Sequence, residues 1–211
     1  HLLVGTCVAL PLEHDVLDLA KTVATLDRFS VGRFLFGVGA GWNVEELANH
    51  RPIPWAKRYQ ALAECIDALR ALWSDDEAEF HGAFYDFDPV WLFPKPFRRP
   101  HPPVLCGMAG RLGTREAVRW ADGWMPMDVA LGDVTKKVGL FRDAAEQAGR
   151  DPDSIPITFV AFGDPDRATL AGYRELGVER VIIGANRTDW ADPATTLPCL
   201  DHYASMIPDL A

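Results

Sequence analysis

The chain has 211 residues with a formal net charge of −9, and 48% of its residues are hydrophobic. This length suits one good-sized domain or two small ones, and the acidic balance argues against a nucleic acid or an acidic membrane as partner. Its apolar runs are far shorter than the roughly 20 residues of a membrane span. The four cysteines are scattered, which favours buried thiols in a reducing cytoplasm over a disulfide framework or a metal site.

The first third of the chain predicts apolar strands that alternate with helices. Strands are expected at residues 2–9 and 34–38, and Asp15 is a suitable N-cap for a helix that runs through Arg28. The apolar face of that helix comprises Val16, Leu19, Ala20, Val23 and Leu26. A glycine-rich turn, short helical material and a long amphipathic helix at 56–73 follow the second strand.

Residues 74–100 interrupt this alternation. They mix seven aromatic residues with prolines and glycines, which is too long and too aromatic for a simple connection, so we interpret the segment as an ordered insertion. Its aromatic residues either only attach the insertion to the rest of the fold, or Trp91 or Phe93 lines a pocket.

The alternation of strands and helices then resumes. Strands are expected at 103–106, 124–127, 155–162 and 179–184. Helices are expected to open at Gly113-Thr114 and to cover 132–148, 165–176 and 193–206, with Gly149 and Gly177 ending two of them.

Six βα units in succession imply parallel strands joined by right-handed crossovers. Two α/β folds fit, an open doubly wound sheet or a (β/α)8 barrel of the TIM type. Such a barrel normally needs about 250 residues, and the chain begins within a strand. We therefore expect a single partial barrel domain over 1–211 that lacks its first two βα units.

In either fold a ligand lies at the carboxyl ends of the strands. Glycines gather there, at 37–41 after the second strand, at 107–113 after the third, and next to Ala185 and Asn186 after the sixth. The loop at 107–113 is the best phosphate candidate, because glycines before a helix offer free N–H groups to an anion. Arg111 or Arg115 could add charge, and a plain strand-to-helix turn is the alternative.

Few titratable residues stand near these loops. Glu45 and Glu46 begin a helix, where carboxylates are favourable for the dipole alone, and His14 and His50 lie in or near loops. No catalytic triad, carboxylate pair or metal-ligand spacing is present in the sequence. A glycine-lined site with few acids and bases suits a cofactor that carries its own chemistry.

Short motifs across residues 1–130 resemble the luciferase-like monooxygenase superfamily, in particular its branch that uses the deazaflavin coenzyme F420, with FMN as the alternative. The matching segments are Leu19-Ala20-Lys21, Leu26-Asp27, Ser30-x-Gly32-Arg33, Gly37 to Glu46, Arg58, Glu64, Leu69 to Trp73, Phe80-His81-Gly82-x-Phe84, Pro94-Lys95-Pro96, Pro100 to Val104 and Ala121 to Trp124.

The resemblance implies a barrel that holds the cofactor ring at its carboxyl-terminal mouth. It places a peptide bond that is often cis, here Cys7–Val8, against the ring, and it assigns Gly39, Ala40, Gly41 and nearby Glu46 to the ring wall. It assigns the phosphate to Gly107, Met108, Ala109 and Gly110, with Thr114 as a further ligand. The implied reaction is hydride transfer with F420 and a small organic substrate, or oxygen activation with FMN.

The family's second strand often supplies a proton-handling histidine or acid, and we expect that strand to be missing here. The catalytic residue therefore stays unassigned, and a truncated, non-catalytic flavin or deazaflavin binder is a competing hypothesis. A third is an unrelated barrel enzyme with a Schiff-base lysine, although the lysines fall on predicted helices or in the insertion. We expect a cytoplasmic protein that forms a homodimer when full length.

Overall fold

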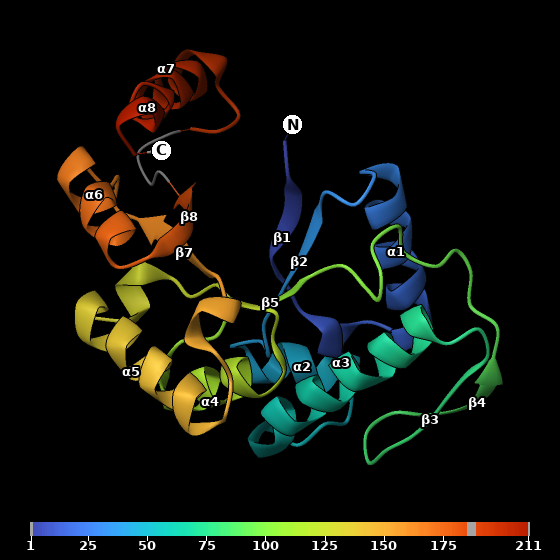
Figure 1. Cartoon of the computed structure of the whole chain (residues 1–211). Helices are drawn as coiled ribbons and strands as arrows, with labels where there is room; N and C mark the ends of the chain where they lie inside the picture. The colour runs from blue at the N-terminus through green and yellow to red at the C-terminus, as the bar shows by residue number, and fades with distance from the viewer. Residues whose placement is uncertain (1, 185–188, 211) are drawn as a thin grey trace.

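The protein is described by a computed structural model covering residues 2–184 and 189–210. Six parallel strands form one curled sheet whose spatial order follows the chain order (Figure 1). They are β1 (Val4–Ala9), β2 (Phe34–Val38), β5 (Val104–Cys106), β6 (Gly123–Trp124), β7 (Ile157–Phe162) and β8 (Val178–Gly184). A doubly wound sheet would reverse the strand order partway, so the arrangement is that of a barrel wall. The predicted barrel fold is confirmed, as a half-barrel sheet.

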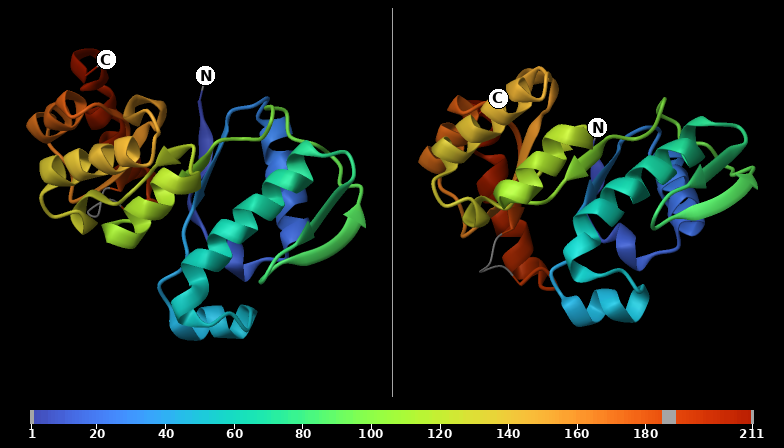
Figure 2. Two further views of the ribbon diagram at one scale, coloured as in Figure 1. Left: turned by 60° about the horizontal axis from the view of Figure 1, so that its bottom comes forward. Right: turned by 90° about the horizontal axis from the view of Figure 1, so that it is seen from below.

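Helices surround the convex side of this sheet (Figures 1 and 2). They are α1 (Val16–Phe29), α2 (Val44–His50), α3 (Arg58–Ser74), α4 (Gly110–Trp120), α5 (Val134–Gln147), α6 (Arg167–Glu175), α7 (Pro193–Ala204) and α8 (Ile207–Leu210). Short 3-10 turns lie at Pro11–Glu13, Trp55–Lys57, Asp128–Ala130 and Pro152–Ser154. None of the helices in the described ranges has the length and apolar character needed to cross a membrane.

The two faces of the sheet are buried in different ways. On the convex face, Phe36 packs edge-on against Trp73 of α3, with ring centroids 6.2 Å apart. Leu35 points to the opposite side, because successive strand residues alternate. There it joins a separate small cluster with Leu105, Met125 and Val160, one layer of inward side chains across neighbouring strands. This layering is typical of a barrel interior.

Capping side chains explain where several helices begin and end. The carboxylate of Asp15 accepts hydrogen bonds from the N–H groups of Leu17 and Asp18, as predicted for the start of α1. Gly149 and Gly177 follow α5 and α6 with φ of +74° and +72°, so each adopts the left-handed conformation that ends a helix.

One expectation about the helices is wrong. Leu26 is 43% exposed, and Asp27 and Ala24 fill the buried face of α1 in its place. The carboxylate of Asp27 is stabilised there because it accepts a 2.8 Å hydrogen bond from the Arg98 N–H. The predicted last helix, 193–206, is found as α7, which ends two residues earlier, and the short α8 follows it.

The insertion is ordered, as expected, and contains an antiparallel hairpin of β3 (Ala78–His81) and β4 (Asp86–Val90). Glu64 of α3 fixes its turn by accepting hydrogen bonds from the N–H groups of Phe84 and Tyr85, at 2.6 and 2.9 Å. Trp91 and Phe93 are 76% and 59% exposed and line none of the described pockets, so the hypothesis that one of them lines a pocket gains no support.

Candidate functional site

The carboxyl ends of β1, β2 and β5 meet around the side chain of Val8. A Cβ atom on Gly39 would stand 3.0 Å from Val8 Cγ2, and one on Gly107 would overlap Val8 Cγ1. Gly107 therefore admits no side chain while Val8 stays in place, and a Cβ on Gly39 would require Val8 to shift slightly. Three segments that the sequence assigned to one cofactor site are in contact at the mouth.

Main-chain hydrogen bonds hold these three segments together. The N–H of Gly39 donates to the carbonyl of Ala9 at 2.9 Å, and the N–H of Gly107 donates to the carbonyl of Val38 at 2.8 Å. The Cys7–Val8 peptide bond is cis, as the resemblance implied. Val8 is 39% exposed, so its side chain is presented at the mouth.

The glycine turn after β2 leads directly into α2. Gly41 has φ of +77°, a conformation that favours glycine, and Asn43 caps the helix by accepting from the N–H groups of Glu45 and Glu46. Ala40 is buried, whereas Glu46 is half-buried. Gly39 and Gly41 therefore shape a wall whose outer surface is main chain.

The predicted phosphate loop is shorter than expected, because α4 begins at Gly110 rather than at Gly113. Gly113 lies inside the helix, where its absent side chain lets α4 approach Met108; a Cβ there would stand 2.7 Å from the Met108 carbonyl. Gly110 has φ of +77° and open space on its Cβ side. Trp124 Nε1 donates to the Met108 carbonyl at 3.0 Å and fixes the loop.

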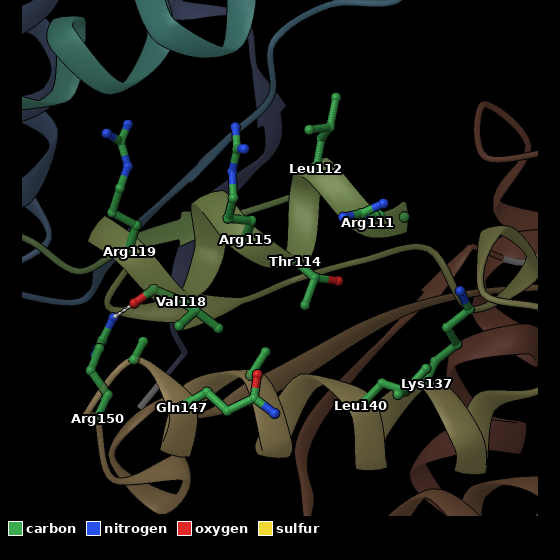
Figure 3. Close-up of a pocket in the computed structure, with 13 residues that line it drawn as sticks. Arg111, Leu112, Thr114, Arg115, Val118, Arg119, Lys137, Leu140, Gln147 and Arg150 are labelled. Atoms are coloured by element: carbon green, nitrogen blue, oxygen red, sulfur yellow. Dashed lines mark hydrogen bonds between the residues drawn. The ribbon is translucent and has the colours of Figure 1, made fainter.

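The largest described cavity lies beside this loop, not at the ring wall. It is a groove of about 890 Å³ between α4 and α5 (Figure 3), and Gly110 and Thr114 are among its lining residues. Val8, Gly39 and Gly41 do not line it. The structure thus places the predicted phosphate residues between the ring wall on one side and a groove on the other.

Glu13, in the turn after β1, is an acid at the mouth that sequence reasoning missed. Its Oε1 atom is 3.8 Å from the position of a Cβ on Gly41. Burial raises the pKa of Glu13, the charge of Glu46 raises it further, and His50 and His14 oppose the shift. Its place just beyond a strand's carboxyl end was the available signal.

Within 2–184 and 189–210, no group of three histidine, cysteine or acidic side chains is arranged to hold a metal ion. The predicted contribution of Ala185 and Asn186 lies outside the described residues.

A parallel half-barrel with glycine turns at the carboxyl ends of its strands defines the class of TIM-type α/β barrels, whose ligand sites lie at that end. Residues 1–196 match the family described as luciferase-like monooxygenase. The chain belongs to that family. This membership leaves no support for an unrelated Schiff-base barrel enzyme.

Curated relatives include proteins of both cofactor types. An uncharacterised Mycobacterium tuberculosis protein is 44% identical over 186 residues, 85% of this chain and 62% of the relative. An FMNH(2)-dependent dimethylsulfone monooxygenase of Pseudomonas putida is 35% identical, covering 74% of this chain and 44% of the relative. An F420-dependent hydroxymycolic acid dehydrogenase of M. tuberculosis is 29% identical, covering 81% and 48%. The chain thus spans less than two thirds of these relatives.

Solved structures share the fold over the whole chain. The monooxygenase RslO1 of Streptomyces bottropensis matches with a TM-score of 0.80 and 22% identity, covering 100% of this chain and 79% of that one. An F420-dependent secondary alcohol dehydrogenase, solved with an F420-acetone adduct, matches with a TM-score of 0.77 and 18% identity, covering 100% and 80%.

Proposed function

We propose that this chain forms the cofactor-binding part of an F420-dependent oxidoreductase acting on a small organic substrate. The contact of Val8 with Gly39 and Gly107 carries the proposal, because it leaves a wall with few side chains where a planar ring can lie against main chain. The F420-dependent dehydrogenase among the curated relatives supports the choice of cofactor.

The residues present fit a deazaflavin with a phosphate-bearing side chain. Val8 and the main chain of Gly39 to Gly41 would hold the ring, and the loop from Gly107 to Gly110 would hold the phosphate at the start of α4. The cofactor, when bound, supplies hydride chemistry at its C5 carbon. The protein's part is to orient the ring and to exclude water from its buried face.

Glu13 is the residue we assign to proton handling. Hydride transfer to or from an alcohol or carbonyl carbon requires a proton to move at the neighbouring oxygen. Glu13 lies beside Gly41, and burial raises its pKa, followed by the effect of Glu46. A carboxyl group with a raised pKa holds a proton closer to neutral pH than an ordinary glutamate does.

The second candidate is an FMN-dependent monooxygenase, favoured by the 35% identity to an FMNH(2)-dependent enzyme. Both cofactors share the tricyclic ring, the ribityl chain and the phosphate, so the mouth itself suits either. A binder without turnover is the remaining alternative.

The test is to titrate the purified protein with F420 and with FMN and then to assay reduction of the bound cofactor with a panel of small alcohols. Tight binding of F420 followed by its reduction supports the proposal. If only FMN binds, the FMN-dependent monooxygenase is the better assignment. If F420 binds but is not reduced, the non-catalytic binder is favoured. Failure to bind either cofactor overturns all three.

We also propose, as expected from the sequence, that the protein is cytoplasmic and that it forms a homodimer when full length. Sedimentation of the purified protein tests the second of these, since a homodimer has twice the mass of a monomer.

A further inference from the structure

The groove between α4 and α5 is basic in an otherwise acidic protein. Its lining includes five cationic residues, and none of its described lining residues is acidic, although the chain carries a net charge of −9. Its volume of about 890 Å³ lies in the roughly 300–1,000 Å³ range of small-ligand sites. The cationic residues are Arg111, Arg115, Arg119, Lys137 and Arg150.

Three of these cations already have partners. Arg115 and Arg119 form ion pairs with the buried carboxylate of Glu116, at 3.1 and 2.7 Å, and leave α4 on the side away from α5 (Figure 3). Arg150 donates two 2.9 Å hydrogen bonds to the carbonyls of Val118 and Ala121, at the far end of the groove.

The other two cations stand at the end of the groove nearest the mouth. Arg111 is in the first turn of α4 and Lys137 is in the first turn of α5 (Figure 3). Neither side chain has a hydrogen-bond or ion-pair partner among the described residues. Gly110 and Thr114, both assigned to the phosphate, lie at this same end. An anionic chain that leaves the phosphate would therefore meet two uncommitted cations first.

Beyond them, the groove is lined by apolar side chains. Val118 of α4 and Leu140 and Ala144 of α5 are among its lining residues. A suitable occupant is therefore a flexible chain that alternates carboxylates with methylene groups and is attached beyond the phosphate. F420 carries such a chain, an oligomer of γ-linked glutamates, whereas FMN ends at its phosphate.

We propose that this groove binds the oligoglutamate tail of F420, with Arg111 and Lys137 pairing with its first carboxylates. The inference rests on the proposed function and deepens it, because it supplies a physical reason for the protein to prefer F420 over FMN. Attraction between exposed opposite charges weakens as salt is added, so the preference should be strongest at low ionic strength.

The test compares dissociation constants, measured by quenching of deazaflavin fluorescence, for F420 without glutamates and for F420 with a long tail. We expect the tail to tighten binding about tenfold at low salt. The double variant Arg111→Gln, Lys137→Gln should lose that advantage and keep its affinity for the tail-less form. Lys136→Gln is the matched control, because Lys136 lies next to Lys137 on α5 but is exposed and does not line the groove.

Equal affinity of the protein for both forms of F420 would overturn the proposal while leaving the F420 assignment intact. Equal affinity for the two forms is also expected if a second copy of the chain covers the groove, because the tail could then not enter it. The proposal would also be overturned if the double variant lost the same affinity for both forms of F420, because the two cations would then bind the phosphate. If neither form binds, it is the proposed function that fails.

Discussion

Val8 and Gly107 pack so closely that a single carbon atom added to the glycine would overlap a methyl group of the valine. The two residues are 99 positions apart in the chain; Val8 lies in β1 and Gly107 directly follows β5, and these two strands are not neighbours in the sheet. The mouth of the half-barrel is thus closed around one valine.

Replacing Gly107 tests that contact. In Gly107→Ala the new Cβ would overlap Val8 Cγ1 and lie 3.1 Å from the Val38 carbonyl, so Val8 or the loop must shift. We expect a loss of about 1–3 kcal/mol in the free energy of unfolding and at least about tenfold weaker F420 binding. Urea unfolding and fluorescence titration measure the two effects.

Gly139→Ala is the control for the substitution itself. Gly139 lies within α5 with open space on its Cβ side, so alanine there should stabilise the helix by up to about 1 kcal/mol. If Gly107→Ala changes stability and F420 binding as little as this control does, the inference that Gly107 packs tightly against Val8 is wrong.

Gly110 tests the assignment of the phosphate. Its φ of +77° is tolerated by aspartate and asparagine better than by other side chains, and open space surrounds its Cβ position. Gly110→Asp and Gly110→Asn therefore differ mainly in charge. The aspartate should weaken cofactor binding at least about tenfold more than the asparagine, or about 1.4 kcal/mol. Equal affinities in calorimetric titrations would remove the phosphate from this loop.

Glu13 is tested by its effect on turnover rather than on binding. Glu13→Gln should reduce kcat by about 10²- to 10⁴-fold, the usual contribution of a general acid or base, and leave the F420 dissociation constant unchanged. Because burial raises the pKa of Glu13, the pH profile of kcat should show a limb shifted upward from the ordinary pKa of a glutamate, and the variant should lack it.

The exposed Glu45, on the same helix as Glu46, provides the comparison. Glu45→Gln should leave both kcat and its pH profile unchanged. A normal kcat in Glu13→Gln would show that another group handles the proton.

The hairpin of the insertion should respond to pH through His81. Its Nδ1 atom lies 2.6 Å from Asp86 Oδ1, and this hydrogen bond raises the pKa of His81. The protonated ring is favoured in the folded hairpin, so the stabilisation is full below the ordinary pKa of about 6.5 and is lost as pH rises through the raised value. NMR titration should give a lower pKa for His81 in Asp86→Asn; an unchanged pKa would exclude the pair.

The sequence was sufficient for the parallel sheet because its strands are mostly apolar and the turns between elements are marked by glycine, proline or aspartate. β2 falls where it was predicted, and Asp15 caps α1 as expected. Leu26 was misplaced because Asp27, a charged residue, takes the buried position by bonding to the distant Arg98. Periodicity cannot anticipate a partner 71 residues away.

The site was predictable only in part for the same reason. Glycine spacing identified both loops, but Gly113 serves the packing of α4 on Met108 rather than a ligand, a distinction that needs coordinates. The only local signal of Glu13 is its place just beyond the carboxyl end of a strand, and Lys137 has none, since the significance of both depends on residues from other strands and helices.

The most direct measurement of the central claim is a crystal structure of the protein with oxidised F420. The account predicts the ring against Val8 and the main chain of Gly39 to Gly41, with the phosphate bonded to main-chain N–H groups between Gly107 and the first turn of α4. A ring bound away from Val8, or a phosphate held elsewhere, would contradict it.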